Sequence, residues 1–139
     1  MPDKDYLVIY RIIDANLNRL REGLRVIEEF FRFVINCKDK SIELKLLRHS
    51  TIDLENGFGL KKLLKSRDTT SDPLANNNRK EEMRRTDNQS IVLANFKRSQ
   101  EAARVIEEYA KITDHVDLSE KAKLIRFSLY SIEKEIMDK

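Results

Sequence analysis

The sequence predicts an all-α fold: a four-helix bundle from two duplicated helical hairpins with approximate two-fold pseudosymmetry. Three observations support this prediction: long stretches with apolar residues at steps of three and four, few turn-forming residues, and an internal repeat. The chain has 139 residues with only 3 glycines and 2 prolines, too few for a sheet-rich fold with many tight turns. This length suits one domain, 1–139.

The most regular apolar pattern predicts a helix from about Ile13 to Ile35. Its apolar positions advance alternately by three and four residues, as in the seam of a bundle helix. A second pattern predicts a helix from about Leu118 to Met137, and Asp117 with Glu120 has the spacing of a capping box. The two seams are Leu17, Leu20, Leu24, Ile27, Phe31 and Val34, and Leu118, Ala122, Ile125, Leu129, Ile132 and Ile136.

Two less regular patterns predict the remaining helices. One covers about Ser41–Leu54, ends at the glycine-containing run 56–59, and is followed by a short helical extension at Leu60–Lys65. The other covers about Asn88–Thr113 and opens after Thr86, which lies three residues before a glutamine in the manner of a capping box.

The helices belong to two related halves. Residues 15–29 and 94–108 are identical at nine of fifteen positions, at an offset of 79. The second helices repeat as well, as KLLRHS at 45–50 and KLIRFS at 123–128, at an offset of 78. The predicted organisation is hairpin 1 at about 11–65, a loop at 66–87 and hairpin 2 at about 88–137.

The connecting segment 66–87 differs from its surroundings because it is polar and has no apolar period. It contains Pro73 and three consecutive asparagines at 76–78. Loops of this length in a compact domain are usually functional or disordered. Since this one joins two halves that share polar repeats, we expect it to fold over a site as a lid.

Composition narrows the classes of partner. The chain has 27 Lys and Arg against 24 Asp and Glu, and these charges are mixed, so no basic stripe indicates nucleic-acid binding. No apolar run approaches the roughly 20 residues of a membrane span. No signal peptide is visible, and the single cysteine, Cys37, excludes an internal disulfide and is typical of a reducing compartment. We therefore expect a cytoplasmic protein.

Repeated polar residues form a row beside each apolar seam. Asparagine or arginine buried there must find partners, because an unsatisfied polar group costs several kcal/mol. A glycine in a helix costs about 0.8–1 kcal/mol relative to alanine, which a close approach by another helix or a ligand would explain. The rows are Asn16, Arg19, Gly23, Val26 and Phe30, and Asn95, Arg98, Ala102, Val105 and Tyr109, with Glu22 and Glu101 on the next flank.

Spacing alone leaves two interpretations of these rows open. The polar residues could form an internal ion-pair network that fixes the register of the bundle. Alternatively, arginines from both halves could hold phosphate oxygens while carboxylates hold a metal ion. Most of the outer charges are predicted to make surface pairs, namely Arg25, Glu28 and Glu29 with their repeats Arg104, Glu107 and Glu108.

Several familiar chemistries are absent from the sequence. It has no GxxxxGK[ST] loop, no GxGxxG and no HExxH. Its 2 histidines and 1 cysteine are isolated and do not make a zinc site. Glu-x-x-Arg stands where a di-iron bundle would need Glu-x-x-His.

A set of motifs follows in order along the chain, from about Arg11 to Glu135. The motifs are RIIDAN at 11–16, REGLRVIEE at 21–29, LRH at 47–49, RDT at 67–69, SDP at 71–73, ANFKR at 94–98 and EAARVIEEY at 101–109. This ordered set resembles the small all-helical hydroxymethylpyrimidine phosphate kinase family, found alone or fused ahead of thiamine-phosphate synthase. One departure is Leu74-Ala75, where the family carries Gly-Thr, so phosphate contacts of the loop are expected to differ.

The resemblance implies ATP-dependent conversion of 4-amino-5-hydroxymethyl-2-methylpyrimidine phosphate to the diphosphate in thiamine biosynthesis. ATP is then a co-substrate, Mg²⁺ the metal and thiamine-phosphate synthase the functional partner. Since phosphoryl transfer depends on positioning and charge stabilisation, each candidate residue takes a role. The arginines that grip phosphate are Arg19 and Arg98, helped by Arg48, Arg67 and Arg84; the Mg²⁺ candidates are Glu22, Glu101, Asp68 and Asp72; and Asn16 and Asn95 bind polar edges of the substrate or bridge to the metal.

Two other functions remain open. A non-catalytic bundle could bind phosphate or nucleotide with the same arginines, without turnover. A protein-interaction module would show an exposed apolar stripe, and the inward seams with few stray apolar surface residues make it the weaker alternative. The sequence is compatible with a homodimer and does not demonstrate one.

Overall fold

The computed structural model describes residues 4–77 and 84–137, and within these ranges it has helices and no strand. This confirms the predicted all-α class. The elements are α1 (Lys4–Glu29), the π-helical turn η1 (Phe30–Val34), α2 (Lys38–Phe58), α3 (Leu60–Ser66), α4 (Asn88–Ile112) and α5 (Val116–Met137).

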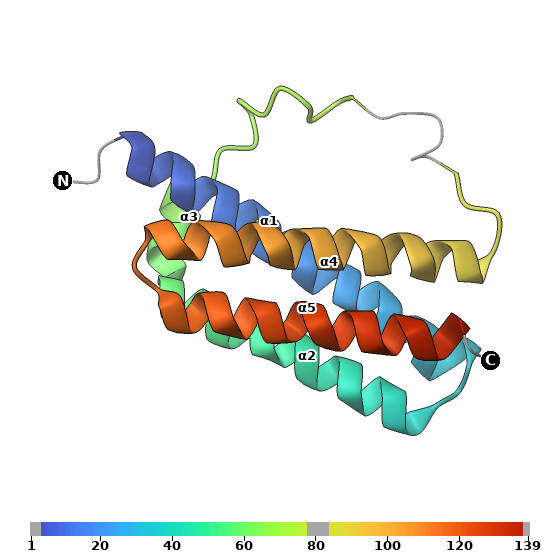
Figure 1. Ribbon diagram of the computed structural model, residues 1–139. Helices are drawn as coiled ribbons and strands as arrows, with labels where there is room; N and C mark the ends of the chain where they lie inside the picture. Colours follow the sequence, from blue (N-terminus) through green and yellow to red (C-terminus); the bar gives the residue numbers. More distant parts are fainter. Residues whose placement is uncertain (1–3, 78–83, 138–139) are drawn as a thin grey trace.

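The four long helices lie side by side (Figure 1). The most extensive contact is between α1 and α4, and the second is between α4 and α5. Helix α2 packs on α1 and on α5, while the short α3 packs on α1. Helices α1 and α4 run in opposite directions, so the start of one lies beside the end of the other. Their long contact positions the candidate site.

The predicted seams form most of the core. From Leu17 to Ile27 every predicted seam residue of α1 is fully buried, and those of α5 from Leu118 to Ile132 are at most 4% exposed. The exception is Val34, which is 49% exposed because the chain has left α-helical geometry there. Burial of these apolar faces is the main force that holds the helices together.

Helix α1 begins nine residues before the predicted start at Ile13. Tyr10 is buried, and its ring meets the ring of Phe58 edge-on at 6.5 Å, so the first turns have a packing partner in the second half of hairpin 1. Sequence periodicity missed this extension because charged residues interrupt the start of the pattern. Burial and a hydrogen bond from Tyr6 raise the pKa of Tyr10 above its ordinary value.

The far end of the first long helix is a π-helical turn instead of the predicted α-helix. The amide of Ile35 donates to the carbonyl of Phe30 at 3.0 Å, and the amide of Cys37 donates to that of Phe31 at 2.8 Å. Asn36 has a φ of 61°, the left-handed conformation that commonly ends a helix.

Helix α2 extends beyond both ends of the predicted Ser41–Leu54 helix. It passes through Gly57 and ends at Gly59, whose φ of 101° suits glycine. Gly57 has a different role, because an added Cβ would lie 2.6 Å from Cδ2 of Leu118. The first glycine therefore permits the approach of α5, and only the second ends the helix.

The predicted capping residues of α4 and α5 differ from those in the structure. Asp87, not Thr86, caps α4: its carboxylate accepts from the amide of Ser90 at 2.7 Å, and the Ser90 hydroxyl accepts from the amide of Asp87 at 3.1 Å. Helix α5 begins at Val116, which places Asp117 inside the first turn and contradicts its predicted capping box.

The surface has more apolar side chains than the sequence predicted. Helix α2 exposes Ile42 and Leu46, and α5 exposes Leu124 and Phe127, each by 46% or more. The expectation of few stray apolar surface residues was therefore wrong. Among the described helices, none combines the length and the apolar character that a membrane span requires.

Candidate functional site

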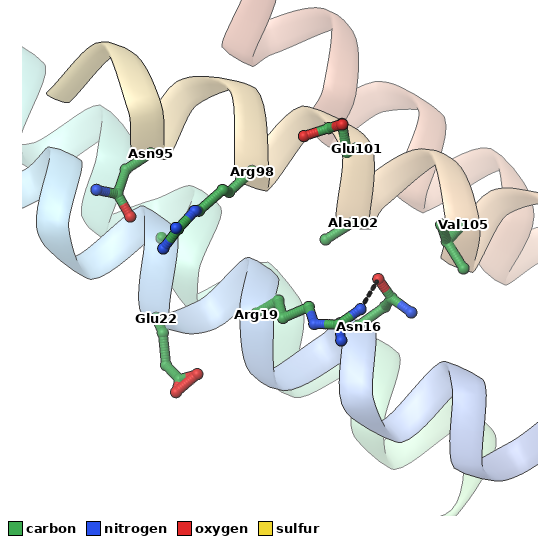
Figure 2. A pocket seen from close by; sticks show the side chains of 9 residues that line it. Asn16, Arg19, Glu22, Asn95, Arg98, Glu101, Ala102 and Val105 are labelled. Carbon is green, nitrogen blue, oxygen red and sulfur yellow. Dashed lines mark hydrogen bonds between the residues drawn. The ribbon is translucent and has the colours of Figure 1, made fainter. Parts of the chain in front are cut away.

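A cavity of about 380 Å³ opens between α1 and α4. Figure 2 shows side chains from the two helices facing one another across it. The cavity brings together the polar residues of both predicted rows and their flanking carboxylates, whereas Val26, Phe30 and Tyr109 of these rows do not line it. Its lining residues are Asn16, Arg19, Glu22, Gly23, Asn95, Arg98, Glu101, Ala102 and Val105.

The two asparagines have the same local arrangement. The amide nitrogen of Asn16 donates to the carbonyl of Ile12 at 2.8 Å, and that of Asn95 donates to the carbonyl of Ile91 at 2.9 Å. The side-chain nitrogen of each asparagine is thus hydrogen-bonded within its own helix, and the side-chain oxygen remains for another partner. The oxygen of Asn16 accepts from Arg19 at the long distance of 3.4 Å, drawn as a dashed line in Figure 2.

The other charged side chains of the cavity have no interaction partner among the described residues. Arg98, Glu22 and Glu101 form no ion pair or hydrogen bond through their side chains within the described part of the chain. Figure 2 shows Arg98 extending toward α1, whereas the side chains of Glu22 and Glu101 point away from the facing helix, in different directions. The predicted ion-pair network therefore does not form here. Unpaired guanidinium groups facing an opening can instead bind anions.

Helix α4 explains the glycine in the α1 row. A Cβ added to Gly23 would overlap the hydroxyl oxygen of Ser99, which is buried and has no hydrogen-bond partner among the described residues. The sequence left either a helix or a ligand as the neighbour of Gly23, and the neighbour is a helix. Ser99 was not singled out because its repeat counterpart is Leu20, so the internal repeat gives no signal for it.

Arg48, predicted to help bind phosphate, does not line this cavity. Its Nε donates to the carboxylate of Glu28 at 2.9 Å, between α2 and α1. Arg126 makes the equivalent contact in hairpin 2, donating two hydrogen bonds of 2.8 and 3.0 Å to Glu107. Hydrogen bonding to Glu107 raises the pKa of Arg126 above its ordinary value.

The predicted surface pairs form between Arg25 and Glu29 and between Arg104 and Glu108, which confirms the prediction for four of the six outer charges. Glu28 and Glu107 are the two exceptions. They are 4% and 5% exposed, whereas the prediction placed them among outward charges. A buried carboxylate requires a cation partner, and the second helix of each hairpin supplies one. The repeated Glu–Arg pair joins the two helices within each half, which is a structural role.

Arg67 and Asp68, the predicted phosphate and metal ligands at the start of the loop, do not line the cavity either. Arg67 forms a bidentate pair with Asp14 at 2.8 and 2.9 Å, and this contact raises the pKa of Arg67. Hydrogen bonds from Ser71 and Thr70 lower the pKa of Asp68. These contacts fix the first residues of the loop beside α1 and do not place them in the cavity.

Asp72 and Arg84 are exposed and do not line the cavity either. The carboxylate of Asp72 accepts from the amide of Leu74 at 2.9 Å, which forms a local turn. Part of the predicted lid, residues 78–83, lies outside the described residues. The roles predicted for Asp72 and Arg84 thus stay predictions.

The carboxylates that line the cavity fit a metal ion that binds together with the phosphates of a nucleotide. In the described ranges no three His, Cys, Asp or Glu side chains are grouped closely enough to hold a metal ion by themselves. Magnesium usually takes only one or two carboxylates and completes its shell with phosphate oxygens and water. Glu22 and Glu101 are free carboxylates beside two arginines, so either could provide such a ligand.

Comparison with known proteins places this architecture in a family. Residues 11–135 match the model of the ThiD2 family. The chain belongs to the ThiD2 family. It is 39% identical over 130 residues to a thiamine-phosphate synthase of Nostoc sp. (strain PCC 7120 / SAG 25.82 / UTEX 2576), covering 94% of this chain and 36% of that protein.

A second relative gives the same result. The chain is 43% identical over 126 residues to a thiamine-phosphate synthase of Thermosynechococcus vestitus, covering 91% of this chain and 34% of that protein. The chain thus spans about a third of the length of these relatives. The predicted relationship to thiamine-phosphate synthases is confirmed, although these two names specify no kinase. No solved structure matches the chain.

Proposed function

We propose that this protein transfers a phosphoryl group from ATP to 4-amino-5-hydroxymethyl-2-methylpyrimidine phosphate, forming the diphosphate used in thiamine biosynthesis. The observation that carries the proposal is the cavity in which Arg19 and Arg98, from the two repeated halves, flank one opening beside two free carboxylates. Membership of the ThiD2 family and relatives named thiamine-phosphate synthase support the pathway.

The reaction requires little covalent chemistry from the protein. An oxygen of the acceptor phosphate attacks the γ-phosphorus of ATP, the bond from that phosphorus to the β–γ bridging oxygen breaks, and ADP leaves. The acceptor oxygen is already anionic, so no strong general base is needed. Catalysis then depends on alignment of two anions and stabilisation of charge on the transferred group.

The cavity residues match these needs. Arg19 and Arg98 neutralise phosphate oxygens, and their fixed forks align two anions that would otherwise repel one another. Asn16 and Asn95 present side-chain oxygens to donor groups of the ligands. Glu22 or Glu101 would hold Mg²⁺, which supplies charge neutralisation at the phosphates.

We also propose that the fold is a single four-helix bundle whose halves are related by an approximate two-fold axis at the cavity. Equivalent features support it: the Arg48–Glu28 and Arg126–Glu107 pairs, and the left-handed residues Asn36 and Asp114 between the helices of each hairpin. The contacts of α1 with α2 and α4, and of α5 with the same two helices, are those of such a bundle. A lid function of 66–87 belongs to the same proposal.

Release of ADP by the purified protein tests the function. Mg-ATP is supplied with the pyrimidine monophosphate, and the unphosphorylated pyrimidine serves as the control acceptor. We expect turnover with the monophosphate only, because the proposal assigns a phosphate group of each of two ligands to the two arginines. Tight nucleotide binding without turnover of either acceptor would instead support the non-catalytic alternative.

A further inference from the structure

A second cavity, of about 470 Å³, lies at the end of the same two helices, where α1 passes into η1 and α4 begins. Its wall is largely apolar and includes Phe30, Phe31 and Val34. The rings of Phe30 and Phe31 meet edge-on at 5.5 Å. This volume is in the range of small-molecule sites, and an aromatic wall favours a flat ring.

Polar groups line one side of this second cavity. Asn88 and Gln89, at the start of α4, are exposed, and their side chains have no partner among the described residues. Each amide offers both a donor and an acceptor, the combination that recognises the edge of a nucleic base. Lys40 and Glu135, also in the lining, form an ion pair and so neutralise one another.

The two cavities share the same helical rows. Phe30 continues the row of Asn16, Arg19 and Gly23 on α1, and Asn88 precedes Asn95 by seven residues on α4. Arg19 and Phe30 are eleven positions apart along α1 and η1, and Asn88 and Arg98 are ten positions apart on α4, which corresponds to about 15–16 Å along a helix. That separation suits a ribose and an extended triphosphate joining a base in one cavity to phosphates in the other.

The two ends of the first cavity differ, and this difference indicates which ligand each end binds. Val105 lines it, but its repeat counterpart Val26 does not. The other end of this cavity, lined by Gly23 and Asn95, is on the side that leads toward η1. The apolar wall of Ala102 and Val105, beside the side-chain oxygen of Asn16, therefore suits the small aminopyrimidine ring.

We propose that the second cavity binds the purine base of the phosphate donor. The donor then enters from the η1 end, and the acceptor ring occupies the end beside Asn16 and Val105. This assignment rests on the proposed kinase function. It divides the α1–α4 groove between the two ligands, with their phosphates meeting at Arg19 and Arg98.

Cys37 provides a direct test, because it lines the second cavity and is the only cysteine of the chain. The rate of its alkylation by N-ethylmaleimide is followed by mass spectrometry with Mg²⁺ and a non-hydrolysable ATP analogue, or with the pyrimidine monophosphate. At about ten times its Kd the analogue leaves about a tenth of the sites free, so we expect alkylation to slow about tenfold. The pyrimidine monophosphate leaves the rate unchanged.

Isothermal calorimetry on the same samples distinguishes failure of the purine subsite from failure of the kinase proposal. Binding of the analogue without protection of Cys37 would overturn the purine subsite and leave the kinase proposal intact. Absence of binding would overturn the kinase proposal and the subsite together. Equal protection by both ligands would also contradict the assignment, because it would reflect a general tightening of the fold.

Variants give an independent readout. Val34 lines the cavity and is 49% exposed, so Val34→Asp is expected to fold and to raise KM for ATP while KM for the pyrimidine monophosphate stays constant. Phe33, its neighbour, is 65% exposed and does not line the cavity, so Phe33→Asp is the matched control. Equal effects of the two substitutions would contradict the subsite.

Discussion

The hydroxyl oxygen of Ser99 lies where any side chain at Gly23 would point. The other nearest atoms leave more room: an added Cβ would lie 3.4 Å from the backbone oxygen of Asn95 and 3.5 Å from the Cβ of Ser99. One hydroxyl group is thus the main obstacle to a side chain at this position. The contact fixes the distance between α1 and α4 beside the cavity.

We expect Gly23→Ala to lower the free energy of unfolding by about 1–3 kcal/mol through overpacking, although alanine favours a helix by about 1 kcal/mol. Ser99→Ala removes a buried hydroxyl without a partner and should change stability little. The double variant should then recover at least wild-type stability. Urea denaturation of all four proteins measures this cycle, and a double variant as unstable as Gly23→Ala would contradict the proposed clash.

The buried pair in hairpin 2 yields a second prediction. The side chains of Arg126 and Glu107 are 10% and 7% exposed, so Arg126→Ala leaves a buried carboxylate without its partner. We expect a loss of about 3–5 kcal/mol in the free energy of unfolding. Arg104→Ala is the matched surface control, since its side chain is 57% exposed, and it should have an effect close to zero. Similar denaturation midpoints for the two variants would refute the structural role of the pair.

Arginines on the two flanks of α4 should differ in activity. Arg98 lines the cavity and has no side-chain partner among the described residues, while Arg104 pairs with Glu108 at 3.2 Å on the surface. We expect Arg98→Ala to lower kcat for ADP release by about 10²–10³ with little change in stability, because it removes charge stabilisation. Arg104→Ala should retain near wild-type kcat. Equal losses in the two variants would remove Arg98 from the catalytic site.

The repeated asparagines should affect different substrates. Asn16 is 5% exposed and lies at the Val105 end, whereas Asn95 is partly exposed at the end that leads to η1. We expect Asn16→Ala to raise KM mainly for the pyrimidine monophosphate and Asn95→Ala to raise it mainly for ATP. Steady-state kinetics with each substrate varied in turn measures both constants. Identical changes of the two KM values in both variants would contradict the assignment of different substrates to the two ends of the cavity.

Much of the fold followed from periodicity. The steps from Leu17 to Ile27 predicted a buried seam, and the structure confirms it, because a helix with one apolar face must cover that face. Boundaries were less accurate. The start of α1 depends on the burial of Tyr10 against Phe58, a tertiary contact that local spacing does not record. The π-helical geometry at Phe30–Val34 had no sequence signal.

The internal repeat predicted which residues gather at the cavity, because equivalent polar residues of the two repeats line it from α1 and from α4. It could not identify partners. Glu28 was predicted on the surface since its helical position is on an outer flank of α1, yet α2 covers that flank and supplies Arg48. Likewise, the ion pair of Arg67 with Asp14 joins residues 53 apart, a distance in sequence over which spacing carries no information.

The central claim is tested most directly by the fate of the γ-phosphate. The protein is incubated with Mg²⁺, γ-³²P-ATP and the pyrimidine monophosphate, and the products are separated by ion-exchange chromatography. The account predicts label in a pyrimidine diphosphate, formed in equal amount to ADP and absent with the unphosphorylated pyrimidine. Label that stays in ATP, or appears only as inorganic phosphate, would contradict it.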